Sequence, residues 1–298
     1  MVEVYDFATK KWSSLPDMPT KRAASSGAII WENKLIVIGG VDEKQVPIAA
    51  VDCFNIETRK WEEFPPLPIG VVGPFVKLID DKIYVIGGTD KKDCNQSVAF
   101  DFDRKEWLPL PPKPSPCYSC GGYLFEKKLY IVGGRDGQTP VKVCEVFDLE
   151  TKQWETLASM TSIRVFYSVI GYKGDIFVIG GLVPMVGICK IVEKYSIREN
   201  KWTRIKDLNE IRSDSAYGVV GGRLVVAGGL GGENLKAMDT VECITPRGKR
   251  FMKLPSLSKA RSSITSLQFE GKLAVLNGVG DGGAQSIVEI LSVKDKDA

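Results

Sequence analysis

The sequence contains no histidine in 298 residues. Histidine is the most frequent general base and the most frequent transition-metal ligand in proteins, so its absence removes the usual centre of both kinds of site. Catalysis would have to rest on carboxylate, lysine, tyrosine or cysteine side chains. We therefore expect no catalytic residue, no metal and no cofactor, and a chain that is not an enzyme.

Cysteine is present, but not in a pattern typical of disulfides. The seven cysteines are odd in number and irregularly spaced, unlike the framework of a small secreted protein. Cys53, Cys144 and Cys243 fall in expected core strands and should be buried. Cys117 and Cys120 form a CxxC motif. If that segment is a strand, residues three apart point to opposite faces, so we expect neither a metal site nor a redox pair there.

Long apolar runs and a charge excess are also missing. The first residues lack the apolar segment of a signal peptide, and no apolar run reaches membrane-spanning length. The net charge is only +3, with 40 basic and 37 acidic residues, which gives no basic surface for nucleic acid. We expect a monomer in the cytoplasm, or also in the nucleus, that binds neither nucleic acid nor membrane.

What the chain does contain is a repeat of two glycines that follow an apolar run. The pairs begin at Gly39, Gly87, Gly133, Gly180 and Gly228, and Asn277-Gly278 is a degenerate sixth copy. The intervals between successive copies are 46 to 49 residues. An aromatic series has the same intervals: Trp12, Trp61, Trp107, Trp154, Trp202 and Phe251. Two independent markers with one period indicate an internal repeat, and this repeat determines the fold.

Each repeat contains the pattern of four short strands. In the first, a strand within residues 24–30 is followed by a polar turn, the apolar run 35–38, the double glycine, a third strand at 52–54 and a fourth that carries Trp61. The apolar runs are too short for helices and apolar on both faces, which is typical of strands covered on both sides. Four strands per repeat predict an all-β, six-bladed propeller with four antiparallel strands per blade, in a single domain over residues 1–298. The glycines should mark strand ends that pack tightly near an axis.

The two ends of the chain both carry a third-strand pattern, at 2–5 and at 287–291. Because ring closure removes sheet edges, we expect the N-terminal strand or strands to complete the C-terminal blade. The surplus copy leaves three arrangements open. Segment 2–5 frays, it displaces 287–291, or the chain lacks the first half of a unit present in seven-bladed relatives.

These motifs resemble the kelch repeat family. The double glycine, the aromatic-Asp turns at Tyr5-Asp6 and Phe147-Asp148, and the tryptophan that follows carry the resemblance, which covers essentially the whole chain. With no BTB-like domain and with the run 225–231, the sequence is most similar to stand-alone kelch domain-containing proteins of the protein 8 type.

The resemblance implies a peptide site at the mouth of the central channel. Kelch adaptors bind peptides through the residue after the arginine that opens the first strand and through the residue after the double glycine. Around these positions the predicted binding residues are Arg22, Thr89, Tyr118, Arg135, Arg164, Arg212, Ser213, Arg261 and Ser262. For the arginines, a role in bracing the scaffold is equally open.

The sequence therefore predicts a non-enzymatic scaffold that binds a protein or peptide partner, and substrate recognition is one form that this role could take. One alternative is a kelch protein associated with actin or the cytoskeleton. Another is a carbohydrate-active isomerase or hydrolase that uses carboxylates and arginine. Kelch oxidases and iron-dependent kelch proteins need histidine, so their sites cannot be carried over. The identity of the partner and the face that binds it are left open.

Overall fold

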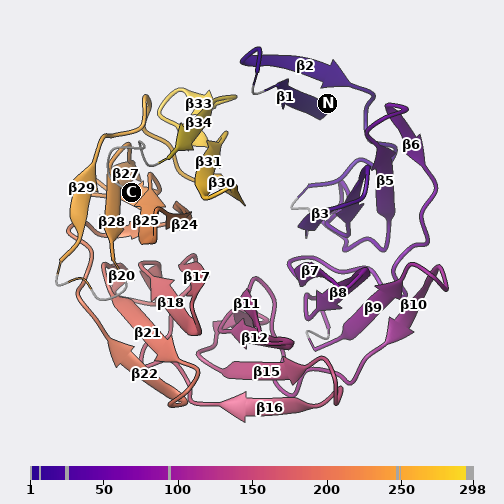
Figure 1. Cartoon of the computed structure of the whole chain (residues 1–298), viewed down its shortest axis with the longest axis horizontal. Coiled ribbons are helices and arrows are strands. Elements are labelled where there is room, and N and C mark those ends of the chain that lie inside the picture. The colour runs from indigo at the N-terminus through magenta and orange to yellow at the C-terminus, as the bar shows by residue number, and fades with distance from the viewer. Residues whose placement is uncertain are drawn as a thin grey trace. The chain divides into compact units, whose positions relative to one another are not determined.

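The computed structural model describes residues 2–6, 8–23, 27–92, 95–245, 248 and 250–292, and their regular elements are β-strands (Figure 1). The chain divides into two compact units. Unit 1 comprises Met1–Cys120, Gly134–Thr139 and Glu150–Trp154; unit 2 comprises Gly121–Gly133, Pro140–Leu149 and Glu155–Ala298. Within the described ranges there is no helix with the length and apolar character needed to span a bilayer.

Unit 1 contains two four-stranded antiparallel sheets. Their strands follow chain order: β3 (Gly27–Trp31), β4 (Lys34–Ile38), β5 (Val51–Asn55) and β6 (Lys60–Glu62), then β7 (Phe75–Ile79), β8 (Lys82–Ile86), β9 (Ser97–Asp101) and β10 (Glu106–Pro109). The first strands, β3 and β7, lie side by side. Ile36 and Val51 of one sheet pack with Val85 and Phe100 of the next, so the apolar runs fill the space between sheets.

Unit 2 repeats this pattern. Its strands are β11 (Gly121–Phe125), β12 (Lys128–Val132), β15 (Cys144–Asp148) and most of β16 (Trp154–Leu157); β17 (Ser168–Tyr172), β18 (Asp175–Ile179), β21 (Val192–Ser196) and β22 (Lys201–Arg204); β24 (Ala216–Val220), β25 (Arg223–Ala227), β28 (Val241–Ile244) and β29 (Met252–Leu254); and β30 (Thr265–Phe269), β31 (Lys272–Leu276) and β34 (Val288–Leu291). First strands again neighbour one another, β11 with β17, β17 with β24 and β24 with β30. An apolar cluster fills each gap between successive sheets.

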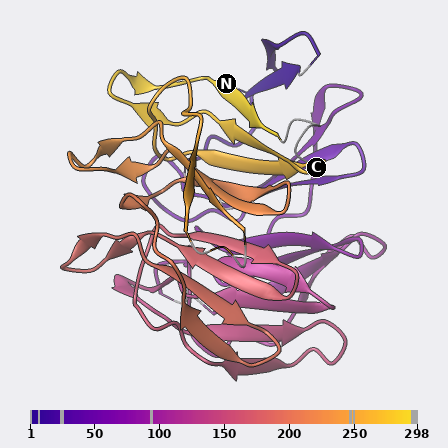
Figure 2. The same cartoon turned by 60° about the vertical axis from the view of Figure 1, so that its left-hand side comes forward.

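Short hairpins follow the double glycines. In unit 2 they are β19 (Leu182–Val183) with β20 (Gly187–Ile188), β26 (Leu230–Gly231) with β27 (Lys236–Ala237), and β32 (Val279–Gly280) with β33 (Gly283–Ala284). The short strand β23 (Arg212–Ser213) joins the second of them. Figure 2 shows the pink, orange and yellow hairpin tips of unit 2 on the same side, at the left of the view. The corresponding connection near residue 135 contains β13 (Arg135–Asp136) and β14 (Thr139–Pro140).

The strand pairing describes both ends of the chain, and the predicted completion of the C-terminal blade stays a prediction. β1 (Val2–Asp6) and β2 (Lys11–Leu15) pair with each other in a separate two-stranded sheet, and β34 is the outer strand of a three-stranded sheet. Asp6 holds the β1–β2 turn, because its Oδ1 accepts hydrogen bonds from the N–H groups of Ala8 and Thr9 at 2.7 and 3.0 Å. In the described chain both third-strand copies are therefore formed, and segment 2–5 is not frayed.

The glycine pairs have the structural role that the sequence predicts. Both glycines of a pair have positive φ, +63° and +98° at Gly180 and Gly181. Gly181 donates its N–H to the carbonyl of Arg212 in the following repeat at 2.9 Å, and a Cβ on Gly180 would lie 2.4 Å from that oxygen. Gly229 bonds the carbonyl of Arg261 in the same way at 2.9 Å. Only glycine allows this approach, so the pairs join successive sheets.

The tryptophans also join successive repeats. Trp61, Trp107 and Trp154 of unit 1 donate Nε1–H to the carbonyls of Pro16, Pro65 and Pro111, each at 2.9 Å. Trp202 of unit 2 donates to the carbonyl of Ala158 at 2.7 Å. Each ring thus bridges its own fourth strand and the crossover that precedes its sheet. Phe251 occupies the same position in its repeat without an N–H group to donate.

Candidate functional site

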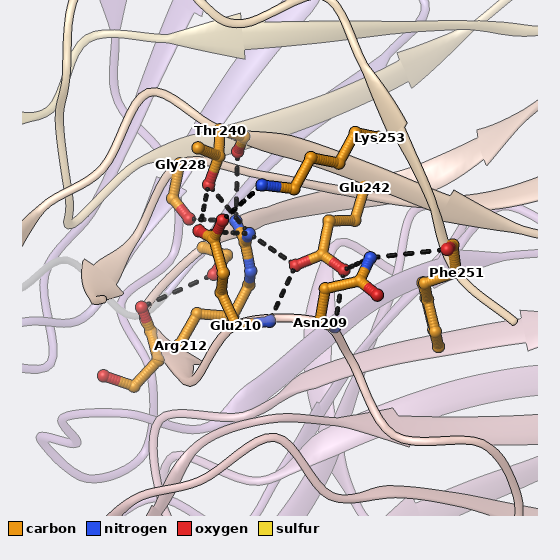
Figure 3. A network of polar contacts seen from close by, with 10 residues as sticks. Asn209, Glu210, Arg212, Gly228, Thr240, Glu242, Phe251 and Lys253 are labelled. Carbon is orange, nitrogen blue, oxygen red and sulfur yellow. Dashed lines mark hydrogen bonds and ion pairs between the residues drawn. The ribbon is translucent and has the colours of Figure 1, made fainter. Parts of the chain in front are cut away.

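The predicted binding residue Arg212 lies inside unit 2, at the start of the loop that leads into β24 (Figure 3). Its Nη1 donates to the carbonyls of Gly228 and Thr240 at 2.9 and 3.0 Å, and its Nη2 donates to Glu242 Oε1 at 2.8 Å. Arg212 is 1% exposed and Glu242 is fully buried. The guanidinium therefore ties the first glycine of the pair to the third strand of the same sheet.

A similar arrangement recurs at Arg164 and Arg22, and Arg261 shares its ion pair. Arg164 binds the carbonyls of Gly180 and Ile191 at 2.9 and 2.8 Å and forms an ion pair with Glu193, both side chains being fully buried. Arg261 is fully buried and pairs with Glu289 at 2.6 Å. In unit 1, Arg22 binds the carbonyls of Gly39 and Ala50 and pairs with Asp52 at 2.5 Å, with 1% of its side chain exposed.

This burial corrects the predicted role of these side chains. The guanidinium groups of Arg22, Arg164, Arg212 and Arg261 are directed into their sheets, so a partner at the surface does not reach them. Ser213 is also buried, at 5% exposure, and its backbone pairs with Leu230. For these four arginines the contacts show a bracing role, which the sequence had left open beside a binding role.

An exposed polar network covers the Arg212 brace. Thr240 Oγ1 donates to Glu210 Oε2 and Lys253 Nζ donates to Glu210 Oε1, each at 2.9 Å (Figure 3). Burial opposes ionisation of Glu210, but these two hydrogen bonds and the charges of Lys253 and Arg212 together outweigh it and hold the pKa of that carboxyl below its ordinary value. The charge of Glu210 therefore contributes to the polar contacts around Arg212 and not to proton transfer.

The other predicted residues are half-buried, and each lies in a local backbone pair. In unit 1, Tyr118 and Arg135 exchange N–H···O bonds at 2.9 Å, and Thr89 pairs with Val72 at 3.0 and 3.1 Å. In unit 2, Ser262 pairs with Val279, with N···O distances of 2.9 and 2.8 Å. Within each unit, the loop before the first strand and the loop after the double glycine therefore meet, as the resemblance implied.

The sequence reasoning missed a position two residues after the buried arginine. In successive repeats it is occupied by Gly73, Ser119, Phe166, Asp214 and Ser263, and each has φ between +50° and +66°. Glycine adopts this conformation easily, whereas a bulky residue rarely does. Phe166 nevertheless adopts it, at +54°, with 55% of its surface exposed. Gly73 occupies the equivalent place in its repeat, and this glycine is the sequence feature that could have indicated a left-handed position there.

Further apolar side chains in unit 2 are exposed on the loops after the double glycines. Met185 and Val186, between β19 and β20, are 107% and 80% exposed, and Leu230 and Leu235 are 37% and 57% exposed. We call Phe166, Met185, Val186, Leu230 and Leu235 the apolar loop face. Exposed apolar groups gathered on neighbouring loops are typical of interaction sites.

Backbone hydrogen bonds connect the loops that carry this face. Val165, next to Phe166, pairs with Leu182 at 3.0 and 2.8 Å, and Asp214 N–H donates to the carbonyl of Phe166 at 2.9 Å. Ser213 in turn pairs with Leu230. The loops of two successive repeats thus form one connected surface within unit 2.

The ranges that the structure describes contain no group of three or more His, Cys, Asp or Glu side chains placed to hold a metal ion. In those ranges the buried carboxylates Glu193 and Glu242 are engaged by arginine, backbone N–H groups and polar side chains.

Comparison with known proteins agrees with this repeat geometry. The family model described as the KLHDC2/KLHL20/DRC7 Kelch-repeats domain matches residues 28–229 and 73–278. Kelch domain-containing protein 8B of Rattus norvegicus is 33% identical over 170 residues, 53% of this chain and 48% of the relative. Kelch-like protein 40 of Mus musculus is 30% identical over 229 residues, 76% of this chain and 29% of the relative. The matches thus cover about half or less of these relatives' lengths.

A solved structure titled "Structure of YjhT" has a TM-score of 0.70 and 18% identity, and the match covers 94% of this chain and 97% of that one. That likeness supports the fold, which with the family match is a kelch β-propeller. The similarity to protein 8B confirms the narrower resemblance seen in the motifs. This chain belongs to the kelch-repeat family.

Proposed function

We propose that this chain is a protein-interaction scaffold without catalytic activity, and that it binds an apolar segment of a protein or peptide on the apolar loop face. Its kelch-repeat relatives support the general role of an interaction module. The exposed phenylalanine with a left-handed backbone is the observation that carries the specific site.

The conformation of Phe166 is unfavourable in two ways. A left-handed backbone costs a non-glycine residue about 1–2 kcal/mol, and 55% exposure leaves much of the ring in water. The left-handed turn recurs in the equivalent loops, but a bulky ring there adds strain that glycine, as at Gly73, avoids, and strained residues cluster at functional sites. A partner that covers the ring would recover apolar burial at about 25 cal/mol per Å².

The polar surroundings support binding rather than catalysis. Arg164 and Arg212, which open the same loops, are held by buried glutamates and backbone carbonyls. These ionic groups rigidify the loop bases, while the tips expose apolar side chains beside polar ones such as Glu233 and Lys236. Aromatic and methionine side chains on a rigid base are typical anchors of protein interfaces.

Thr89, Tyr118, Arg135 and Ser262 extend the proposal to the half-buried positions of both units. Within each unit they lie where these two kinds of loop meet, and they would supply polar contacts to a segment bound there. We propose them as residues that orient a bound segment. The channel mouth, as the general location of such loops in a propeller, is part of the proposal.

A displayed peptide library selected against the purified protein tests the proposal, followed by affinity measurements on the recovered sequences. Phe166→Ser and Met185→Ser should each weaken binding by about tenfold, since anchor truncations typically cost more than 1 kcal/mol. Ile56→Ser is the matched control, because Ile56 is an exposed apolar residue, 46% exposed, in a β5–β6 turn outside the loops after the glycines. Equal binding by all four proteins would refute the site. Turnover of a glycan panel by the wild type would refute the absence of catalysis.

A further inference from the structure

Cys117 and Cys120 of unit 1 lie with their sulfur atoms 3.3 Å apart. The sequence analysis expected opposite faces, on the premise that this segment is an extended strand. That premise is wrong, because Ser119 between them has φ +51° and turns the chain. Both thiol groups therefore point to the same place.

The turn is fixed by backbone contacts within unit 1. Ser119 donates its N–H to the carbonyl of Gly73 at 2.7 Å, and the carbonyl of Cys117 accepts from Gly88 N–H at 2.9 Å. Tyr118 is held against Arg135 by two N–H···O bonds of 2.9 Å. Each residue from 117 to 119 thus has an anchored backbone group, so the approach of the sulfurs is built into the fold.

The glycine pairs leave room for these side chains. A Cβ on Gly87 would lie 3.1 Å from Cys117 Sγ, and a Cβ on Gly134 would lie 3.0 Å from Cys120 Cβ. Both glycines have positive φ, +66° and +98°. The cysteine pair therefore occupies a space that the repeat keeps free of other side chains.

The same two positions differ in the neighbouring repeats. The place of Cys117 is taken by Arg164, Arg212 and Arg261, the buried braces, and the place of Cys120 by Tyr167, Ser215 and Ile264. The repeat that begins this loop at Cys117 has no guanidinium at the brace position. A covalent link at the base of its loop would be an alternative way to fix the same turn.

We propose that Cys117 and Cys120 form a reversible disulfide and make this loop a site of reaction with low-molecular-weight disulfides such as glutathione disulfide. An S–S bond is about 2.05 Å long, so closure needs the sulfurs to move by little more than about 1 Å. The proposal concerns the thiol pair alone and is independent of the proposed peptide binding.

The difference in exposure assigns the two sulfurs their roles. Cys120 is half-buried and reaches solvent, whereas Cys117 is fully buried. The Cys120 thiolate attacks glutathione disulfide, forms a mixed disulfide and releases one glutathione thiolate. The Cys117 thiolate then attacks the Cys120 sulfur and releases the second glutathione. Two protein thiols are oxidised by two electrons, one glutathione disulfide is reduced, and the two protons end on the glutathione products.

Thiol trapping tests the inference on the full chain. The native protein is equilibrated in glutathione buffers of varied redox ratio, quenched with acid, alkylated and mapped by peptide mass spectrometry. We expect the 117–120 peptide to lose both thiols together in an internal disulfide that reductant reopens. Cys117→Ser should accumulate glutathione on Cys120, because the second thiol is missing, and Cys120→Ser should react more slowly than wild type.

Cys53→Ala is the matched control, since Cys53 is a buried thiol of β5 in the same unit and its loss should leave the 117–120 reaction unchanged. Far-UV circular dichroism of each variant checks that it is folded. The inference is overturned if native wild type forms no internal 117–120 disulfide at any ratio, or forms it only in urea.

Discussion

At the scale of single residues, the arginines and Phe166 have opposite roles in the same loops. Arg212 and Arg164 are buried and satisfied by carbonyls and glutamate. Phe166 is exposed and has a backbone conformation that its side chain disfavours. Buried ion pairs fix the base of the loop, and at its tip Phe166 combines a left-handed backbone with a side chain that is more than half exposed.

Removal of one brace should strongly destabilise the fold. Arg212→Ala leaves Glu242 as an uncompensated buried charge, and we expect the free energy of unfolding to fall by about 3–5 kcal/mol in urea titrations. Lys253→Ala is the control, because that exposed side chain pairs only with the outer carboxylate Glu210 and should leave the unfolding midpoint unchanged. Similar losses in both variants would contradict the bracing role.

Replacement of Phe166 by glycine should separate stability from function. Phe166→Gly relieves the left-handed strain, and after the entropy cost of glycine we expect a gain of about 0.5 kcal/mol in the free energy of unfolding. The same variant should lose affinity for selected peptides. Chemical denaturation and peptide titration measure the two effects, and a loss of stability would argue that the ring is a structural residue.

At the scale of elements, the repeat made the strands predictable, because glycine, aromatic and apolar residues recur for local reasons. The structure confirms several features predicted from the repeat. They are the strand ends, the burial of Cys53, Cys144 and Cys243, and the position of the tryptophans between successive repeats. The turn at Ser119 was missed, although Gly73 at the equivalent place of the preceding repeat was a signal for it. The Ser119 N–H donates to the Gly73 carbonyl at 2.7 Å, a contact between repeats that only the fold shows.

The tryptophan bridge can be tested by removal of its hydrogen bond alone. Trp202→Phe keeps an aromatic ring but leaves the Ala158 carbonyl without the 2.7 Å Nε1–H donor. We expect a loss of about 1–3 kcal/mol in the free energy of unfolding, from that carbonyl and the smaller ring. Urea denaturation of the variant and of the wild type, analysed with the same m value, measures this loss in the free energy of unfolding. An unchanged midpoint would mean that packing alone makes the bridge.

Two buried tyrosines of unit 2 should make the fold sensitive to alkali. Burial raises the pKa of Tyr130 to about 12 and also raises the pKa of Tyr195. Because the folded pKa exceeds the unfolded value near 10, their contribution is complete below about pH 10 and is lost as pH rises from there towards 12. Tyr130→Phe should reduce the slope of stability against pH in that window, which thermal melts at stepped pH would measure. An identical slope would refute the assignment.

At the scale of the whole molecule, the sequence predicted the repeat architecture and left the strand pairing at the two ends of the chain open. Both terminal third-strand copies have the same local pattern, so their neighbours decide which sheet each joins. β1 pairs with β2 across a turn held by Asp6, and β34 pairs with β31. A bracing role and a binding role of Arg22, Arg164, Arg212 and Arg261 could not be separated in the sequence, because only the fold shows that these guanidinium groups are directed inward.

The most direct test of the account is the affinity of peptides selected against the wild-type protein, measured again on Phe166→Ser, Met185→Ser and Ile56→Ser. The account predicts a loss of about tenfold for each of the first two and wild-type affinity for the third. Wild-type affinity in all three variants would contradict the claim that the apolar loop face is the binding site.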